Sequence, residues 1–400
     1  MQMARRFGLP SLLPLMLFAC GESITAPGSC PDFCPTAEIR LIDTLLTGVI
    51  ERDTTFAGYV QPHQATSMQV VGGPTQRTRG MLRFLVFSDS TFLDSLNIVP
   101  VLALDSFRLE VFLTNRSPDV TGLEITVHRL PVTIDTLTSF DDVTPFFEDS
   151  TIIGVFSVPD SVTNDTISAI LPGDAFPTID ADSGVTAVGL SIRGASPAFA
   201  TMSTVQIGLG AVLWRFVQAD SVGTGVPRMD FTRPSLDTFV YTGPPTVADP
   251  DALVVGGSPA ARSFLRVNVP AFIIDSSEVV KAELLLVPFE PVLGAPADSM
   301  QLSADGVSAD FGPKSPLLLT VDSLRVTESV AVGSTDTIIV DMTQLMATWQ
   351  LDSTIVRTLV LRVGNEGGTI GELRLGSSKT PGLLPAIRLT FVPPFTFVPR

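Results

Sequence analysis

The sequence predicts an all-β protein made of two tandem antiparallel β-sandwich domains, jelly-roll-like in form and related by an internal duplication. Short runs of Val, Ile, Thr, Leu and Phe are separated by Gly, Pro, Asp and Ser, which is the pattern of strands and turns. Apolar and polar residues alternate over 107–113, 123–130 and 358–363, as expected for strands with one buried face. The 32 prolines leave few windows for a long helix.

The second observation behind this fold class is a repeat within the chain. Asp53-Thr54 precedes Val70-Val71-Gly72-Gly73 by the same interval that separates Asp237-Thr238 from Val254-Val255-Gly256-Gly257. Further blocks match in the same order: 81–84 with 264–267, 109–111 with 282–284, 165–167 with 336–338, 189–193 with 358–362, and 205–208 with 373–376. Matched blocks in a constant order indicate a duplication.

The matched blocks place copy one at 40–222 and copy two at 234–395, with a Gly- and Pro-containing linker at 223–233. Each copy is long enough for about ten strands, and turn signals recur at the spacing of a sandwich or jelly roll. The best helical candidate is 342–350, where Leu345, Met346 and Trp349 fall on one face. We expect Trp349 to be a core residue; a ligand platform is the alternative.

Residues 1–19 have the features of an export signal. Arg5 and Arg6 precede an apolar run over 7–19, and the run ends at Leu17-Phe18-Ala19-Cys20. This segment resembles a bacterial lipoprotein signal peptide with its lipobox. The resemblance implies cleavage before Cys20, a diacylglycerol group on the Cys20 sulfur and acylation of the new amino terminus. More than one acyl chain is what stable membrane anchoring requires.

Two other interpretations of residues 1–19 remain open. A membrane-spanning helix needs about 20 apolar residues, whereas this run is shorter and contains Pro10 and Pro14. A plain secretory signal shares the charged head and apolar middle but does not end at a cysteine. Gly21, which follows the cysteine, favours the outer membrane over inner-membrane retention. We therefore expect a lipid-anchored protein of the bacterial cell envelope.

Residues 20–36 are rich in Gly, Ser, Pro and Cys and are predicted to form a flexible tether. Two of the chain's three cysteines, Cys30 and Cys34, lie within this tether. Export to an oxidising compartment favours a disulfide between them. Free thiols and a metal site are the alternatives, and a metal site is disfavoured because two sulfurs without a nearby histidine make a poor zinc cage.

The chain carries 41 acidic and 25 basic residues, for a formal net charge of −16. This balance argues against nucleic acid as a partner, because phosphate binding draws on clustered Lys and Arg. The acidity is explained most simply by solubility, and binding of divalent or other cationic partners is the functional alternative. No cofactor is expected.

Copy two resembles the DNRLRE-type domain of secreted bacterial proteins. The matching segments run in order along the chain: Asp237-Thr238-Phe239-Val240-Tyr241, Val255-Gly256-Gly257, the strands 264–269 and 282–286, the segment 339–349 that ends at Trp349, Gly376-Ser377-Ser378, and the final strand 385–391. Copy one matches more loosely and has Trp214 in a different place. The resemblance implies a jelly-roll-like sandwich, similar in shape to carbohydrate-binding modules, without catalytic residues.

Candidate catalytic residues are few. The two histidines are His63 and His128, and His128 is expected to be a solvated residue on a strand. A serine hydrolase would need one of them as its base, but Gly189-Leu190-Ser191-Ile192-Arg193 fails the G-x-S-x-G pattern at its last position. Paired carboxylates could support glycoside hydrolysis; the candidates are Asp141, Asp142 and Glu148, although no pattern distinguishes them.

Two acidic segments are candidate turns. Asp180-Ala181-Asp182-Ser183-Gly184 has oxygen ligands at alternate positions, like a fragment of a calcium loop, but it has no later glutamate. An Asx-rich turn is the favoured interpretation, and a structural calcium ion is the alternative. Asp249-Pro250-Asp251 is predicted to be a plain turn.

These observations predict a lipid-anchored envelope protein with a non-catalytic structural or binding role. A carbohydrate-binding surface lipoprotein is the alternative, although the scarcity of Trp and Tyr (two of each) weakens it. An unrecognised glycoside hydrolase is the third hypothesis. Aromatic side chains along one exposed sheet face would favour glycan binding, and uniformly polar faces would favour a structural role.

Overall fold

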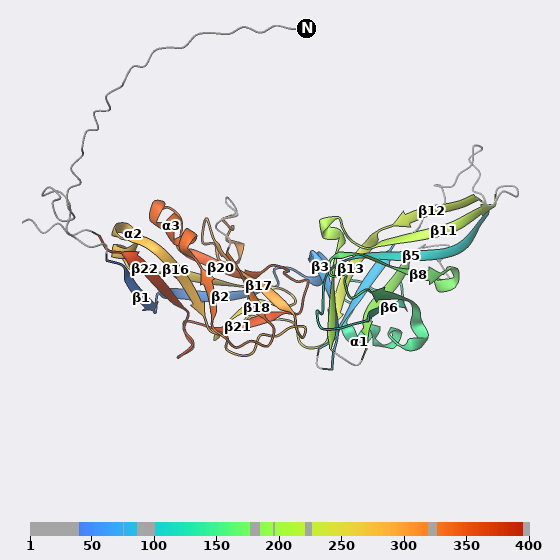
Figure 1. The fold of residues 1–400 in the computed structure, drawn as a ribbon, viewed down its shortest axis with the longest axis horizontal. Helices are drawn as coiled ribbons and strands as arrows, with labels where there is room; N and C mark the ends of the chain where they lie inside the picture. Colours follow the sequence, from blue (N-terminus) through green and yellow to red (C-terminus); the bar gives the residue numbers. More distant parts are fainter. Residues whose placement is uncertain are drawn as a thin grey trace, which may run out of the picture. The chain divides into compact units, whose positions relative to one another are not determined.

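The strands of the computed structural model are antiparallel throughout, which confirms the all-β class (Figure 1). The structure describes residues 40–74, 76–85, 101–176, 185–194, 197–220, 226–318 and 326–394. Leu41–Arg400 form one compact unit, in which the described strands assemble into four sheets. The sheets surround two large apolar cores, one between each pair of sheets.

The first sandwich is continuous in sequence. Its strands are β3 (Ser67–Gly72), β4 (Thr78–Phe84), β5 (Val101–Arg116), β6 (Leu123–Leu130), β7 (Ile152–Val158), β8 (Asp165–Pro172), β9 (Thr186–Arg193), β10 (Ala198–Ser203), β11 (Val212–Asp220), β12 (Val226–Thr232) and β13 (Pro234–Tyr241). One sheet has the order β12-β11-β5-β10-β3, with β8 also paired to β5, and the other has the order β13-β4-β9-β6-β7. Phe84, Phe107 and Phe156 are fully buried between them.

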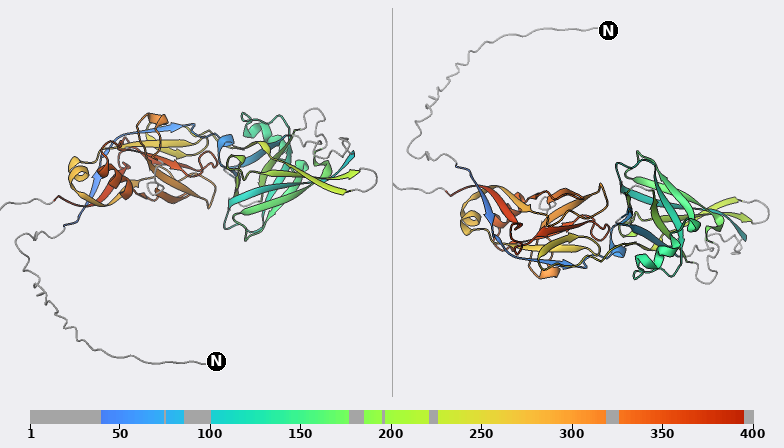
Figure 2. Two further views of the ribbon diagram at one scale, coloured as in Figure 1. Left: turned by 90° about the horizontal axis from the view of Figure 1, so that it is seen from above. Right: turned by 90° about the horizontal axis from the view of Figure 1, so that it is seen from below.

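The second sandwich draws on both ends of the chain. Its strands are β14 (Ala252–Gly256), β15 (Ala261–Val267), β16 (Glu278–Leu286), β17 (Ser299–Gly306), β18 (Val326–Ala331), β19 (Ile338–Asp341), β20 (Thr358–Val363), β21 (Glu372–Gly376) and β22 (Ala386–Val392), together with β1 (Ile42–Thr47) and β2 (Ile50–Ala57). Strand β1 pairs with β22, and β2 pairs with β15. Figures 1 and 2 show these blue strands among the yellow and red ones.

Short helices lie between the strands. They are α1 (Phe140–Val143), α2 (Ala271–Ser276) and α3 (Thr343–Leu351), with 3-10 turns η1 (Pro62–Gln64), η3 (Thr144–Phe146), η4 (Asp149–Thr151), η5 (Gly173–Ala175), η6 (Val205–Ile207) and η7 (Gly312–Lys314). Helix α3 matches the predicted helical segment within one residue. Trp349 is only 1% exposed and packs in the second core, which confirms its prediction as a core residue.

The two sandwiches have similar strand orders, but one pair of strands changes sheet. Strands β3 and β10 join β5 in the first sandwich, whereas their counterparts β14 and β21 join β15 in the second. Each consists of eleven described strands, and β3–β11 correspond in order to β14–β22, while β12 and β13 correspond to β1 and β2. Asp237 of β13 pairs with Leu82, and its repeat counterpart Asp53 of β2 pairs with Leu265. The two Asp-Thr blocks therefore take equivalent places, on the strand that pairs with β4 or with β15.

Two strand pairs nevertheless join segments from different predicted copies. β13 begins where copy two is predicted to begin, yet it pairs with β4 of the first sandwich, and β2 pairs with β15 of the second. The physical reason is that β2 and β13 carry the same pattern, so either fits the open edge of β4 or β15. Chain order places the first sandwich between β2 and β14 of the second.

Two of the matched sequence blocks take a different alignment in the structure. The sequence match places Leu190 opposite Leu359. The pairing of β4 with β9 and of β15 with β20 instead aligns Leu190 with Leu361, a shift of two residues. Residues 205–207 form η6, whereas Leu373 and its neighbours lie in β21. Short apolar blocks carry little register information, because a shift of two residues keeps the same face buried.

The repeated aspartates have equivalent structural roles. Asp237 Oδ2 accepts a hydrogen bond of 2.6 Å from the backbone N–H of Val205, just after β10. Asp53 accepts hydrogen bonds from the backbone N–H of Ser378 (2.5 Å) and from its hydroxyl (3.0 Å), just after β21. Each carboxylate thus satisfies backbone donors at a turn, which gives a structural reason for the Asp-Thr blocks.

Candidate functional site

Several predicted sites lie outside the described residues. These are Cys20, Cys30, Cys34 and the segment Asp180–Gly184. Within the described ranges, no group of three or more His, Cys, Asp or Glu side chains is arranged to hold a metal ion. No helix in the described part of the chain is long and apolar enough to cross a membrane.

The outer face of the first sandwich carries a row of large side chains across four strands. Cross-strand pairing aligns Phe231 of β12 with Trp214 of β11, Trp214 with Arg108 of β5, and Arg108 with Ile170 of β8. Phe231 is 51% exposed and Ile170 is 65% exposed. We call the Phe231, Trp214, Arg108 and Ile170 row, with the adjacent Phe216 and Met229, the aromatic face.

A single carboxylate orients the centre of this face. Glu110 Oε2 accepts a hydrogen bond of 2.7 Å from the Trp214 indole N–H, and Glu110 Oε1 lies 3.0 Å from Arg108 Nε. The Arg108 guanidinium lies 5.5 Å from the ring centroids of both Trp214 and Phe216. The rings of Trp214 and Phe231 are in contact, with centroids 5.1 Å apart. The indole is therefore held in place before any ligand arrives.

The second sandwich lacks this row at the equivalent positions. The outward-facing residues of the corresponding strands include no aromatic side chain: they are Asp43, Leu45 and Thr47 on β1, and Ala386, Arg388 and Thr390 on β22. Arg388 instead forms an ion pair of 3.2 Å with Glu283, which also pairs with Lys281 at 2.5 Å. Because the corresponding strands form a sheet without these side chains, this arrangement of strands does not require an aromatic face.

The expectation that His128 is solvated is wrong. His128 is 3% exposed, because the segment that carries α1, η3 and η4 covers the outer face of its sheet. The Phe147 ring of this segment lies 4.8 Å from the imidazole. Gly189 makes room for it, since a Cβ there would be 2.4 Å from the ring. Periodicity within one strand cannot reveal a covering segment contributed by other residues.

Three hydroxyl groups surround the imidazole. Nδ1 lies 3.0 Å from Thr151 Oγ1, and that hydroxyl donates to the carbonyl of Glu148 (2.7 Å). Nδ1 is therefore assigned as the protonated nitrogen. Nε2 lies 3.0 Å from Ser191 Oγ and 2.9 Å from Thr126 Oγ1. The neutral ring is thus satisfied on both sides.

The structure brings Ser191 and His128 together, although the sequence pattern around Ser191 did not indicate it. The distance suits a nucleophile and its base, but the group that orients Nδ1 is a hydroxyl and not a carboxylate. Burial, with a smaller contribution from the charge of Arg79, lowers the pKa of His128 to about 4. We interpret the pair as part of a polar cluster that packs beneath Phe147.

We predict that this histidine makes the first sandwich sensitive to acid. An unfolded chain protonates histidine near pH 6.5, whereas folding lowers the pKa of His128 to about 4, despite the opposing charge of Asp149. The unfolded state then binds more protons as the pH falls from about 6.5 to about 4, so the free energy of unfolding falls, by on the order of 3 kcal/mol. Urea denaturation at pH 7 and pH 4.5 measures this loss.

The control for this prediction is His128→Gln, which cannot be protonated. The variant should show a smaller fall in urea midpoint between the two pH values than the wild type. Parallel falls in the two proteins would rule out His128 as the source of the acid sensitivity.

The candidate catalytic carboxylates have local roles. Asp142 accepts hydrogen bonds from the backbone N–H (2.9 Å) and hydroxyl (2.6 Å) of Ser139 in the capping box of α1. These bonds hold the pKa of the Asp142 carboxyl below its usual value. Asp141 is an exposed residue of the same helix, and Glu148 is the residue that precedes η4. Their placement favours helix capping over paired acid–base chemistry.

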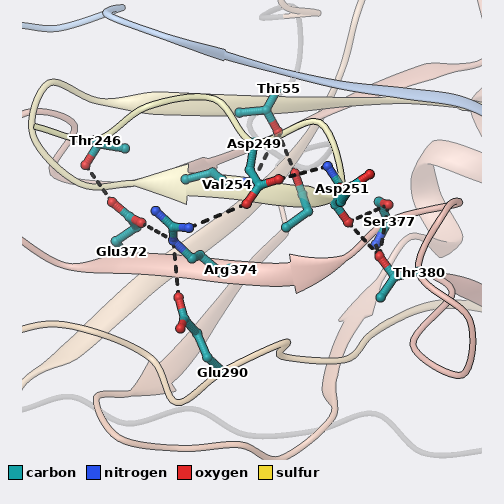
Figure 3. A network of polar contacts seen from close by, with 11 residues as sticks. Thr55, Thr246, Asp249, Asp251, Val254, Glu290, Glu372, Arg374, Ser377 and Thr380 are labelled. Atoms are coloured by element: carbon teal, nitrogen blue, oxygen red, sulfur yellow. Dashed lines mark hydrogen bonds and ion pairs between the residues drawn. The ribbon is translucent and has the colours of Figure 1, made fainter.

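Asp249-Pro250-Asp251 forms a turn, as predicted: Asp249 Oδ1 accepts the backbone N–H of Asp251 at 2.8 Å. Figure 3 shows that this turn belongs to a polar network in the second sandwich. Three carboxylates converge on the Arg374 guanidinium, those of Glu372 at 2.7 Å, Glu290 at 3.2 Å and Asp249 at 3.6 Å. The network ties the 246–251 segment to β21 and is explained by structural cross-linking.

No protein-family model matches this chain, and a search of curated proteins returns no significant relative. The sheets themselves define the class of protein, which is an all-β sandwich protein. The resemblances to lipoproteins and to DNRLRE-type domains rest on the residues quoted above.

Proposed function

We propose that this is a lipid-anchored protein of the bacterial cell envelope with a non-catalytic binding role. The anchor is supported by Leu17-Phe18-Ala19-Cys20 and the tether that follows it. On this proposal, Cys20 carries the lipid, and the sandwiches are displayed at the membrane surface, in the outer membrane by the Gly21 criterion.

The anchor is tested by Cys20→Ala. The variant should leave the membrane fraction and lose palmitate labelling, whereas Cys30→Ala should keep both properties. Palmitate labelling that persists in Cys20→Ala would refute the lipobox.

The aromatic face is the observation that supports a binding role. Sugar rings present faces of C–H bonds that pack on aromatic rings, and their hydroxyl groups need polar partners. Trp214 and Phe231 supply adjacent rings, while Arg108 and Glu110, on the strand next to Trp214, supply charged hydrogen-bonding groups. We infer that the ligand is a glycan. Phe231, Met229 and Ile170 lie on one face and are more than half exposed, and an exposed apolar patch of this kind is typical of an interaction site.

The test is a glycan and polysaccharide array probed with residues 36–400, which retain every described strand. Binding to a defined group of glycans is the expected result. Silence across the array would remove the glycan hypothesis and leave a protein partner or a structural role.

A further inference from the structure

A second feature of the first sandwich lies at β4 and β9, which belong to the sheet without the aromatic face, and it extends to the end of β3. A pocket of about 400 Å³ is lined by Gly72, Gly73, Arg77, Arg79, Ser191 and Phe147, among others. Both charged side chains in its lining are arginines, in a chain of net charge −16. The pocket is thus a positive site on an acidic protein.

The arginines of the pocket are not neutralised within the described residues. Arg79 Nη1 donates to Thr144 Oγ1 at 2.8 Å, and Arg77 Nε donates to the carbonyl of Gly73 at 2.9 Å. Neither side chain forms an ion pair with a carboxylate in the described part of the chain. Burial and the nearby charge of Arg77 lower the pKa of Arg79. An anion between the two guanidinium groups would relieve their repulsion.

Two rings fix the plane of the Arg79 guanidinium. Its central carbon lies 4.2 Å from the Phe140 ring centroid and 4.5 Å from the Phe147 ring centroid. A guanidinium that packs on an aromatic ring keeps its N–H groups for hydrogen bonds in its own plane. Only one hydrogen bond of the Arg79 guanidinium is made to a described residue, so N–H groups remain for a ligand.

The equivalent position of the second sandwich shows what such an arginine binds. Strand registers align Arg79 with Arg262. Arg262 also faces an aromatic ring, that of Tyr59 at 4.3 Å, and its Nε and Nη2 donate to the two oxygens of Glu366 at 2.6 and 2.7 Å. An internal carboxylate therefore fills the fork of the stacked arginine in this sandwich.

The first sandwich has no such internal carboxylate. Glu366 lies in the turn that follows β20, and the corresponding turn after β9, residues 194–197, contains no acidic residue in the sequence. The neighbouring ion pair is also replaced: strand pairing aligns Arg362 with Ser191 and Asp305 with His128. A charged, self-neutralised cluster in one sandwich thus corresponds to a positive pocket with neutral polar groups in the other.

From this comparison we propose that the pocket binds the carboxylate group of an external ligand, with Arg79 as the bidentate donor and Arg77 as the second positive charge. The pocket holds a carboxylate with the small group attached to it, such as a sugar acid or a short organic acid. Ser191 also lines the pocket, as a neutral polar residue beside the two arginines. The proposal does not depend on the aromatic face, because no residue of that face lines the pocket.

The test is calorimetric titration of the detergent-solubilised full chain with glucuronate, acetate, glucose and phosphate. Glucuronate is expected to bind and glucose is not. If acetate binds with the same affinity as glucuronate, the site recognises the carboxylate alone. If glucuronate binds more tightly than acetate, the site recognises a sugar acid. Binding of phosphate without either carboxylate, or no carboxylate binding at about 10 mM, would overturn the proposal.

Variants locate the binding. Arg79→Gln is expected to weaken glucuronate binding at least about tenfold, because a bidentate, charge-assisted contact is lost. The exposed Arg77 offers a second variant, Arg77→Gln, which changes the pocket charge without removing the stacked group and should weaken binding less. The control variant is Arg52→Gln, which removes one positive charge from an exposed site on β2. This variant should bind glucuronate with the affinity of the wild type. Unchanged affinity in both pocket variants would also overturn the proposal.

Discussion

A chain that lacks residues 42–57 is expected to lose the folded second sandwich and to keep the first. All six residues of β1 pair with β22, and β2 pairs with β15 in the interior of the other sheet. Val49 and Ile50, which lie at the β1–β2 connection, are buried in the second core. Removing these strands opens a core and leaves two long strand edges unpaired. The first sandwich contains all its own strands between Ser67 and Tyr241.

Urea denaturation of residues 58–400 against residues 36–400 measures this effect. The truncated chain should lose the unfolding transition of the second sandwich, and hydrogen exchange should show strands β14–β22 unprotected. A peptide of residues 40–57 added in trans should restore their protection. A truncated chain with all its transitions unchanged would contradict the assignment of β1 and β2 to this sandwich.

Substitution of Trp349 by alanine is expected to destabilise the second sandwich by about 3–5 kcal/mol, the usual cost of emptying a large aromatic site in a core. Trp349 is 1% exposed and packs in the core with Leu345 and Met346 from the same helix. The shift in urea midpoint of the second sandwich measures this change.

The matched control on the same helix is Leu351→Ala. Leu351 is 89% exposed, so its loss should change the free energy of unfolding by no more than about 0.5 kcal/mol. Comparable effects of the two substitutions would show that Trp349 does not anchor α3 to the sheet.

Sequence periodicity predicted those features that depend on neighbouring residues in the chain. The alternation over 107–113 matches β5, whose Phe107, Leu109, Val111 and Leu113 face the core. The helix around Trp349 was predicted for the same reason. Both patterns reflect one buried face, which a single segment reveals by itself.

Features that depend on distant residues could not be predicted in this way. The Asp-Thr blocks of β2 and β13 carry the same signal, and nothing in either block specifies whether its partner is β4 or β15. The burial of His128 depends on Phe147, and the alternating pattern of β6 contains no information about that ring.

The candidate sites show the same distinction. Trp214 was recognised as an isolated residue, but its partners come from three other strands, so the aromatic face emerges only from the register of β12, β11, β5 and β8. Arg79 has no distinguishing sequence motif. Its open fork becomes visible through comparison with the Arg262–Glu366 pair of the other sandwich.

The proposed binding of a glycan to the aromatic face of the first sandwich is tested most directly by array binding with a matched set of variants. Trp214→Ala with Phe231→Ala should abolish the signal of residues 36–400. Leu45→Ala, which removes an exposed apolar side chain from the equivalent face of the second sandwich, should leave the signal unchanged. Binding that survives the double substitution in a folded protein would contradict glycan binding at the aromatic face.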